Sequence, residues 1–266
     1  MKKSGNGNSS LDDLSSLLRG WKYDEDNNVR RFRTKAGREV LQVRLPLGVE
    51  QYELNGRPDG LKPEGHDSWL DMYREQSEVY GREFVLDDDA LERLVNEGLL
   101  FYHRYLLFFQ IQEFELCVRD TSRNLRLLEF VNSHAGKQEH VEVLEQYRPY
   151  IKGMQVMARA LHKVKELSDF RSAIRILRQG RETVENLDPL PDNEIFEFER
   201  SRALMKIGDL LDQLEKQMPQ SLSEKLETKL QRAIEDEDYE LAAELRDRLN
   251  SLTSSSETSD SDEASR

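Results

Sequence analysis

The residues that could carry acid–base or nucleophilic chemistry gather at the end of the most apolar stretch of the chain. Glu113 and Glu115 could act as buried carboxylates with a raised pKa, as catalytic acids do. On a helix they point to different faces because they are two positions apart, so they do not form an acid–base pair. Arg119, four residues after Glu115, is the expected ion-pair partner. Cys117 lies in the same apolar stretch and is expected to be a core residue rather than a nucleophile.

The sequence lacks the motifs that usually carry nucleotide or metal chemistry. It contains no glycine-rich phosphate loop, no Gly-x-Gly-x-x-Gly and no His-Glu-x-x-His, and none of its five histidines follows a Glu by three residues. The single cysteine excludes an internal disulfide and a cysteine-rich zinc site. We therefore expect no enzymatic activity, no cofactor and no metal. Catalysis near His103 and Glu113 is a further hypothesis, and it requires a sizeable polar pocket.

A basic patch with interleaved aromatic residues lies between residues 20 and 45. Seven basic side chains stand there against four acidic ones, and unpaired bases could stack on such a surface. The candidate nucleic-acid contacts are Arg31, Phe32, Arg33 and Arg44. The other interpretation is a solvated strand face that protects a sheet edge. The net charge of the whole chain, -13, argues against broad binding to phosphate backbones.

The N-terminal quarter predicts a short disordered or helical segment over residues 1–20, followed by an antiparallel β meander over residues 21–60. Alternating apolar and polar residues predict strands at 29–34, 39–45 and 48–54. Leu41, Val43 and Leu45 share one face of the middle strand. The turn formers at residues 55–60 are interpreted as a connection, with backbone binding of a ligand as the alternative.

Residues 61–218 predict a helical bundle. The expected helices cover residues 68–80, one long stretch from 87–89 to about 132, then 137–167, 169–187 and 193–218. Apolar spacings of three and four in the third helical region favour coiled-coil-like packing. Pro149 leaves open whether that region is one kinked helix or two helices joined near Arg148. Ala173 and Gly180 would allow a close helix crossing.

Residues 219–252 predict a helical hairpin. One apolar stripe includes Leu226, Leu230 and Ala233, and a second includes Ala242 and Leu245. The acidic run between the stripes predicts the turn, with the last acidic residue, at position 238, as N-cap of the second helix. So short a hairpin buries little apolar surface, and we expect its stripe to meet another surface.

Residues 238–249, Asp-Tyr-Glu-Leu-Ala-Ala-Glu-Leu-Arg-Asp-Arg-Leu, resemble the UVR motif, the helical hairpin shared by the excinuclease subunits UvrB and UvrC. In that family the hairpin is a docking module between repair subunits, and related copies occur in bacterial stress regulators and protease adaptors. The resemblance covers about 31 residues, 222–252, of the 266. It implies a bacterial protein with a mode of interaction linked to DNA repair or stress response, and it implies no activity.

The hairpin is expected to bind a protein partner or a second copy of itself. Its charge disfavours nucleic acid, because residues 222–252 hold nine acidic and five basic side chains. A partner with an apolar groove and a basic rim would suit it. The candidate partner-binding residues are Leu230, Ala233, Tyr239, Ala242, Ala243, Leu245, Arg246, Asp247 and Leu249.

The sequence thus predicts a mainly α fold: a small N-terminal antiparallel β meander, a helical bundle, a C-terminal helical hairpin and a disordered acidic tail over residues 253–266. No apolar segment is long enough to span a bilayer, and no signal peptide is recognisable. We therefore expect a cytoplasmic protein. The leading hypothesis is a non-enzymatic interaction protein, and the alternative is a nucleic-acid-binding accessory factor that uses the basic meander.

Overall fold

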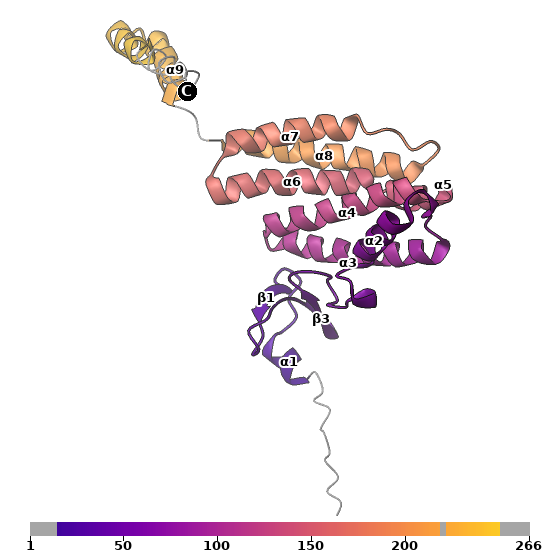
Figure 1. The fold of residues 1–266 in the computed structure, drawn as a ribbon. Coiled ribbons are helices and arrows are strands. Elements are labelled where there is room, and N and C mark those ends of the chain that lie inside the picture. Colours follow the sequence, from indigo (N-terminus) through magenta and orange to yellow (C-terminus); the bar gives the residue numbers. More distant parts are fainter. Residues whose placement is uncertain (1–14, 219–221, 251–266) are drawn as a thin grey trace, which may run out of the picture. The chain divides into compact units, whose positions relative to one another are not determined.

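The computed structural model describes residues 15–218 and 222–250. It confirms a mainly α fold with an N-terminal sheet and a C-terminal helix pair (Figure 1). The chain divides into two compact units, Met1–Leu214 and Glu215–Arg266, which are described separately below. The tail at residues 253–266 and most of the predicted segment at residues 1–20 lie outside the described residues. The remainder of that segment forms the short helix α1, Ser15–Gly20.

The β meander has the three strands that the sequence predicts. They are β1 (Val29–Arg33), β2 (Glu39–Leu45) and β3 (Gly48–Glu53), antiparallel in the order β1-β2-β3. The central strand is buried on both of its faces. Leu41 belongs to the same hydrophobic cluster as Tyr105 and Phe108 of the bundle, so one face of the sheet packs against helices. This packing stabilises a sheet too small to be stable in isolation.

The helices of the first unit follow the sheet. They are α2 (Trp69–Tyr80), α3 (Asp88–Gln110), α4 (Phe114–His134), α5 (Gln138–Glu145), α6 (Arg148–Leu167), α7 (Phe170–Glu185) and α8 (Glu194–Gln217). Helices α3, α4, α6 and α7 stack in sequence order, each against the next (Figure 1). Within the described ranges, no helix is both long and apolar enough to cross a membrane.

The prediction of one long helix to about residue 132 was wrong. The chain leaves the helix at Gln112, whose φ is +61°, and reverses into α4. The Glu113 N–H donates to the Phe108 carbonyl at 2.8 Å, and the Gln112 N–H donates to the Phe109 carbonyl at 3.1 Å. These two bonds form a Schellman motif, which usually has glycine at its left-handed position. The sequence hid this helix end because a glutamine stands there.

The Pro149 region is two helices, one of the two possibilities that the sequence left open. Helix α5 ends at Glu145, and α6 begins at Arg148 with Pro149 in its first turn. Proline is tolerated there because the first helical N–H groups have no intrahelical acceptor. A proline at that position starts a helix and produces no kink.

Two small residues bring helices into close contact, as the sequence predicts for Gly180. A Cβ atom added to Gly180 would lie 2.2 Å from a methyl carbon of Val156, and one added to Gly153 would lie 2.8 Å from the Cβ of Ala203. Gly180 and Ala173 are both buried on α7. The glycines therefore set the spacing of α6 to α7 and to α8.

A buried charge cluster ties the end of the sheet to the bundle. Arg104 and Asp120 are each 1% exposed, and Asp120 accepts from Arg104 Nε at 2.7 Å and from Nη2 at 3.0 Å. Arg104 also donates to the Glu53 carbonyl at 2.8 Å. Arg119 reaches the same carboxylate at 2.9 Å and donates to the Leu54 carbonyl. The expected pairing of Arg119 with Glu115 is therefore wrong, because its guanidinium is engaged by Asp120 and the sheet end.

A second carboxylate, Glu97, joins α3 to three other segments and is completely buried. It pairs with Arg123 of α4 and with Arg57 of the connection after β3, the latter at 3.1 Å. It also accepts from the backbone N–H groups of Trp69 and Leu70 at 2.8 and 3.2 Å. These N–H groups belong to the first turn of α2, where a negative charge is favoured. Glu97 therefore fixes where α2 begins.

Replacing Asp120 with alanine should destabilise the chain strongly. It leaves the guanidinium of Arg104 buried without a counter-charge, a change that costs about 3–5 kcal/mol. Urea unfolding of the full chain measures this loss. Glu129→Ala, on the exposed face of the same helix, should change stability by no more than about 0.5 kcal/mol. Equal losses in the two variants would contradict the role of the pair.

Gly180→Ala should also destabilise the chain, by about 1–3 kcal/mol, because its Cβ would overlap the side chain of Val156. A second substitution, Val156→Ala, should restore part of that loss by making room. Gly208→Ala is the matched control, since a Cβ at this helical glycine meets open space, and it should stabilise the helix by up to about 1 kcal/mol. Thermal unfolding of the three variants tests the assignment.

Candidate functional site

The C-terminal hairpin is built from α9 (Leu222–Glu235) and a second helix over residues 239–250. The Asp238 carboxylate accepts from the Leu241 N–H at 3.1 Å, which confirms Asp238 as the N-cap. Helix α9 ends at Glu235, and Glu237 in the turn that follows has a φ of +59°. The Asp238 N–H donates to the Ala233 carbonyl and the Glu237 N–H to the Ile234 carbonyl, which forms a second Schellman motif without glycine.

The apolar stripe of the hairpin is covered mainly by the hairpin itself. Leu226, Ala233, Ala242 and Leu245 are buried against one another, and Leu230 and Leu249 pack against them half-buried. The small side chains of Ala233 and Ala242 lie inside this cluster, 3% and 8% exposed. The expectation that the stripe meets another surface is therefore corrected: the two helices of the hairpin cover most of it themselves. Among the predicted partner-binding residues, the stripe members hold the two helices together.

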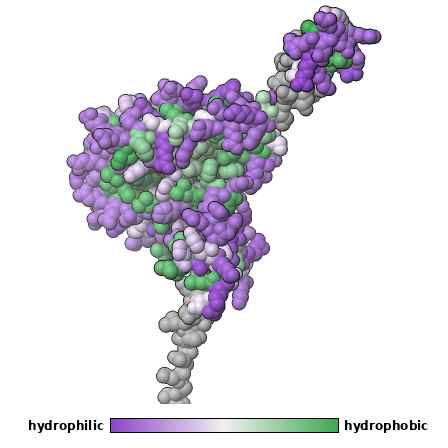
Figure 2. Space-filling model, turned by 180° about the vertical axis from the view of Figure 1, so that it is seen from behind, coloured by the Kyte–Doolittle hydropathy of each residue, from purple (hydrophilic) through white to green (hydrophobic). Residues whose placement is uncertain are grey.

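On the described part of the hairpin, the large apolar side chains that remain exposed lie around the turn. Tyr239 is 70% exposed, Ile234 47% and Leu241 43%. Five carboxylates accompany them in the same eight residues, at positions 235–238 and 240. The face of the hairpin that Figure 2 shows is largely hydrophilic. We call residues 234–241 the turn tip.

The remaining predicted contacts, Ala243, Arg246 and Asp247, are exposed on the second helix. An ion pair on this helix joins Arg248 to Glu244 at 3.2 Å. The structure thus separates the nine predicted residues into an internal set and an exposed set. Of the nine, Tyr239 alone is a turn-tip residue.

The four candidate nucleic-acid contacts in the meander do not form one surface. Successive residues of a strand point to opposite faces, so Arg31 and Arg33 lie on one face and Phe32 on the other. Arg31 pairs with Glu39 and Glu113 at 2.9 and 3.1 Å, hydrogen bonds that raise its pKa. Arg33 also pairs with Glu39.

Arg44, the fourth candidate, is 6% exposed. It donates to the carbonyl oxygens of Trp21 at 2.8 Å, of Leu45, and of Gly48 at 3.2 Å. Arg30 stacks on Trp21, 3.9 Å from the ring centroid, and lies 5.0 Å from the Phe32 centroid. The guanidiniums of Arg44 and Arg30 and the rings of Trp21 and Phe32 are thus engaged in contacts inside the protein, within the sheet and the segment that precedes it.

The candidate catalytic residues are not brought together. Glu113 lies at the start of α4 and pairs with Arg31, whereas Glu115 and His103 are exposed. Cys117 is completely buried, and burial raises the pKa of its thiol, so it stays protonated at neutral pH. In the described part of the chain, no group of His, Cys, Asp and Glu is placed to hold a metal ion.

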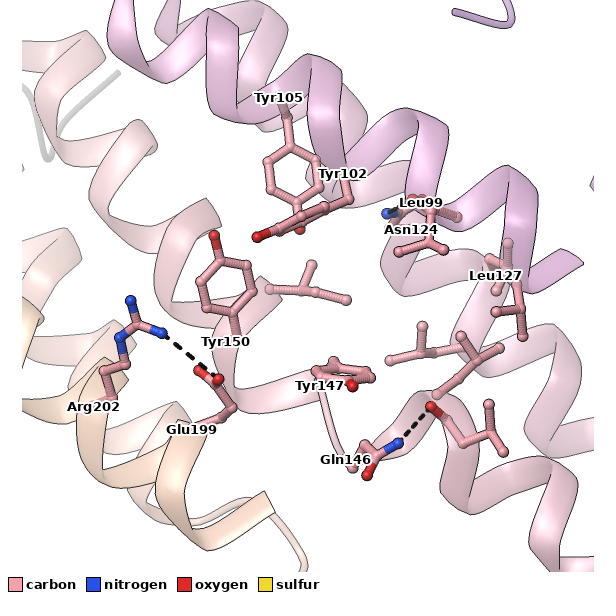
Figure 3. A pocket seen from close by; sticks show the side chains of 16 residues that line it. Leu99, Tyr102, Tyr105, Asn124, Leu127, Gln146, Tyr147, Tyr150, Glu199 and Arg202 are labelled. Carbon is pink, nitrogen blue, oxygen red and sulfur yellow. Dashed lines mark hydrogen bonds and ion pairs between the residues drawn. The ribbon is translucent and has the colours of Figure 1, made fainter. Parts of the chain in front are cut away.

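The bundle also contains a tyrosine-lined cavity of about 430 Å³, which the sequence did not predict. Its walls come from α3, α4, α5, α6, α8 and the α5–α6 turn (Figure 3). Tyr102 packs edge-on against both Tyr105 and Tyr150, with ring centroids 5.5 and 5.9 Å apart. Burial is the main cause of the raised pKa of Tyr150, and a hydrogen bond with Tyr102 adds to it.

One end of this cavity is polar. Arg202 of α8 lies 3.7 Å from one carboxylate oxygen of Glu199, as drawn in Figure 3. The other oxygen is buried and accepts no hydrogen bond from the described residues. Neither His103 nor Glu113 lines the cavity, so it does not support the hypothesis of catalysis at that pair.

The family model described as UvrB/uvrC motif matches residues 220–254, which confirms the resemblance of the hairpin. The match covers a small part of the chain and leaves the meander and the bundle without a family. No curated protein and no solved structure matches the chain. The function of the chain is therefore best approached through the hairpin.

Glu237→Gly should stabilise the hairpin by about 1 kcal/mol, because a left-handed conformation costs a non-glycine residue roughly that amount. Amide hydrogen exchange of residues 233–245 in the full chain measures the change as slower exchange. Glu235→Gly is the control, since Glu235 is helical and its replacement should speed exchange. The idea fails if both glycines have the same effect.

Proposed function

We propose that this chain is a non-enzymatic interaction protein and that its hairpin docks on a protein partner through the turn tip. The observation that carries the proposal is the exposure of Tyr239, Ile234 and Leu241 beside the turn of an element that matches the UvrB/uvrC motif. The motif is known from DNA repair and protein interaction, and the context we propose is DNA repair or stress response.

Docking through the turn tip leaves the hairpin intact. The residues buried between the two helices, among them Ala233 and Leu245, cannot reach a partner without unfolding the hairpin. Tyr239 needs no such change because most of its side chain is already in solvent. Tyrosine is also a residue type that often dominates the free energy of binding at interfaces.

The charge of the tip suggests the chemistry of the partner. Five carboxylates at positions 235–238 and 240 would repel an acidic surface and favour a partner with a basic rim around an apolar groove. A second copy of the hairpin would bring the same negative charges together. We therefore favour a different protein over self-association.

Removal of the hairpin by truncation after Met218 should abolish capture of the partner while the bundle stays folded. Affinity purification from the native cells, with quantification of the co-purified proteins, measures this loss. The first unit buries its own hydrophobic core, so its thermal unfolding should remain cooperative. Recovery of the same proteins with and without the hairpin would contradict the proposal.

A double substitution separates docking from folding. Tyr239→Ser with Leu241→Ser should weaken capture on the order of tenfold or more, because contacts at the centre of an interface carry most of its free energy. The helix content should stay unchanged, since both side chains are exposed. Lys229→Ser with Thr228→Ser, at exposed positions of α9 away from the turn, is the matched control and should retain capture.

A further inference from the structure

A second cavity, of about 370 Å³, lies between the end of the sheet, the start of α2 and the helices α3 and α4. Its lining includes six arginines: Arg57, Arg74, Arg104, Arg119, Arg123 and Arg126. Three of them follow one another on α4 at positions 119, 123 and 126, a spacing that places them on one face of the helix. So dense a group of guanidinium ions is unexpected in a chain with a net charge of -13.

Four of these arginines share too few carboxylates for one-to-one pairing. Asp120 forms ion pairs with both Arg104 and Arg119, and Glu97 forms ion pairs with both Arg57 and Arg123. The one further acidic partner of these four is Asp59, which pairs with Arg57 at 2.9 Å. The four cations therefore face three carboxylates.

The other two arginines add to this excess. Arg74 on α2 and Arg126 on α4 are both exposed, and the structure shows no ion pair for either within the described ranges. Two further acidic residues line the cavity, Asp67 and Asp71. Asp67 is paired with Lys62 at 2.9 Å, so only Asp71 is available to offset the charge of the arginines. The six arginines thus exceed their local carboxylates by two positive charges.

We propose that this cavity binds the phosphoryl group of a small ligand. A phosphate dianion carries two negative charges, which would balance the two excess positive charges of the arginine cluster. Guanidinium groups bind phosphate oxygens through paired N–H donors. Arg74 and Arg126 supply these donors, because the guanidiniums of Arg104 and Arg123 are buried in ion pairs. A single carboxylate group offers fewer oxygens and one charge.

The size of the cavity favours a small molecule. Ligand sites of about 300–1,000 Å³ hold molecules up to the size of a nucleotide or a drug. The segment after β3 contributes Asn55 and Gly56 to the lining, and Arg119 binds the Asn55 side chain at 2.8 Å. The first residues of the run of turn formers therefore form part of the wall, and backbone binding of a ligand by residues 55–60 stays a prediction.

Isothermal titration calorimetry of the full chain at low ionic strength tests the proposal. The probes are inorganic phosphate, pyrophosphate, adenosine monophosphate and, as a carboxylate of comparable charge, citrate. We expect saturable binding of at least one phosphorylated probe, with a weaker response to citrate. Orthophosphate as the tightest probe indicates the free ion as ligand, and tighter binding of pyrophosphate or the nucleotide indicates a larger phosphorylated molecule.

The variant Arg74→Gln with Arg126→Gln should weaken this binding at least about tenfold, because it removes two charge-assisted donors. Both side chains are exposed, so the fold should persist, as circular dichroism can verify. Arg171→Gln with Arg181→Gln removes the same charge from the exposed face of α7 and should retain binding. Three results would overturn the proposal: no binding of any phosphorylated probe, equal weakening in the two double variants, or tighter binding of citrate.

Discussion

The attachment of the β meander to the bundle depends on two buried carboxylates. Asp120 and Glu97 pair with arginines from the helices and from the segment after β3. The two arginines paired with Asp120, Arg104 and Arg119, also donate to backbone carbonyls at the end of the sheet. A three-stranded sheet has little apolar area with which to fold by itself. Its position is therefore determined by charge pairing as well as by Leu41, and a buried pair tolerates little displacement of its partners.

Where the structure describes the hairpin, its two helices are held together by apolar contacts rather than by buried ion pairs. Its contact surface is apolar, and the small residues Ala233 and Ala242 let the two helices cover that surface themselves. The large apolar side chains that stay exposed are concentrated at the turn, where Tyr239 stands among carboxylates. In the docking that we propose, one set of residues would hold the helix pair together and another set would contact the partner.

The sequence predicted the elements whose signals are local. The strand alternation and the N-cap at Asp238 depend on neighbouring residues, and both appear in the structure. The helix start at Arg148 is one of the two possibilities that Pro149 left open. The break at Gln112 was missed because its left-handed residue is not glycine. The charge clusters were missed for another reason. Arg57 and Glu97 are 40 positions apart, and a periodic pattern in the sequence does not predict a contact between residues so distant in the chain. Five of the nine predicted docking residues pack between the two helices of the hairpin, and the sequence did not show this because periodicity identifies an apolar stripe without showing what covers it.

Cys117 has a use that follows from its position. It is the single thiol of the chain, and it lies in the cluster where Leu41 of the sheet meets the bundle. A thiol-reactive dye can reach it only when those layers separate, so the rate of labelling reports how often the molecule opens there. Cys117 is therefore a built-in probe of local opening in the core.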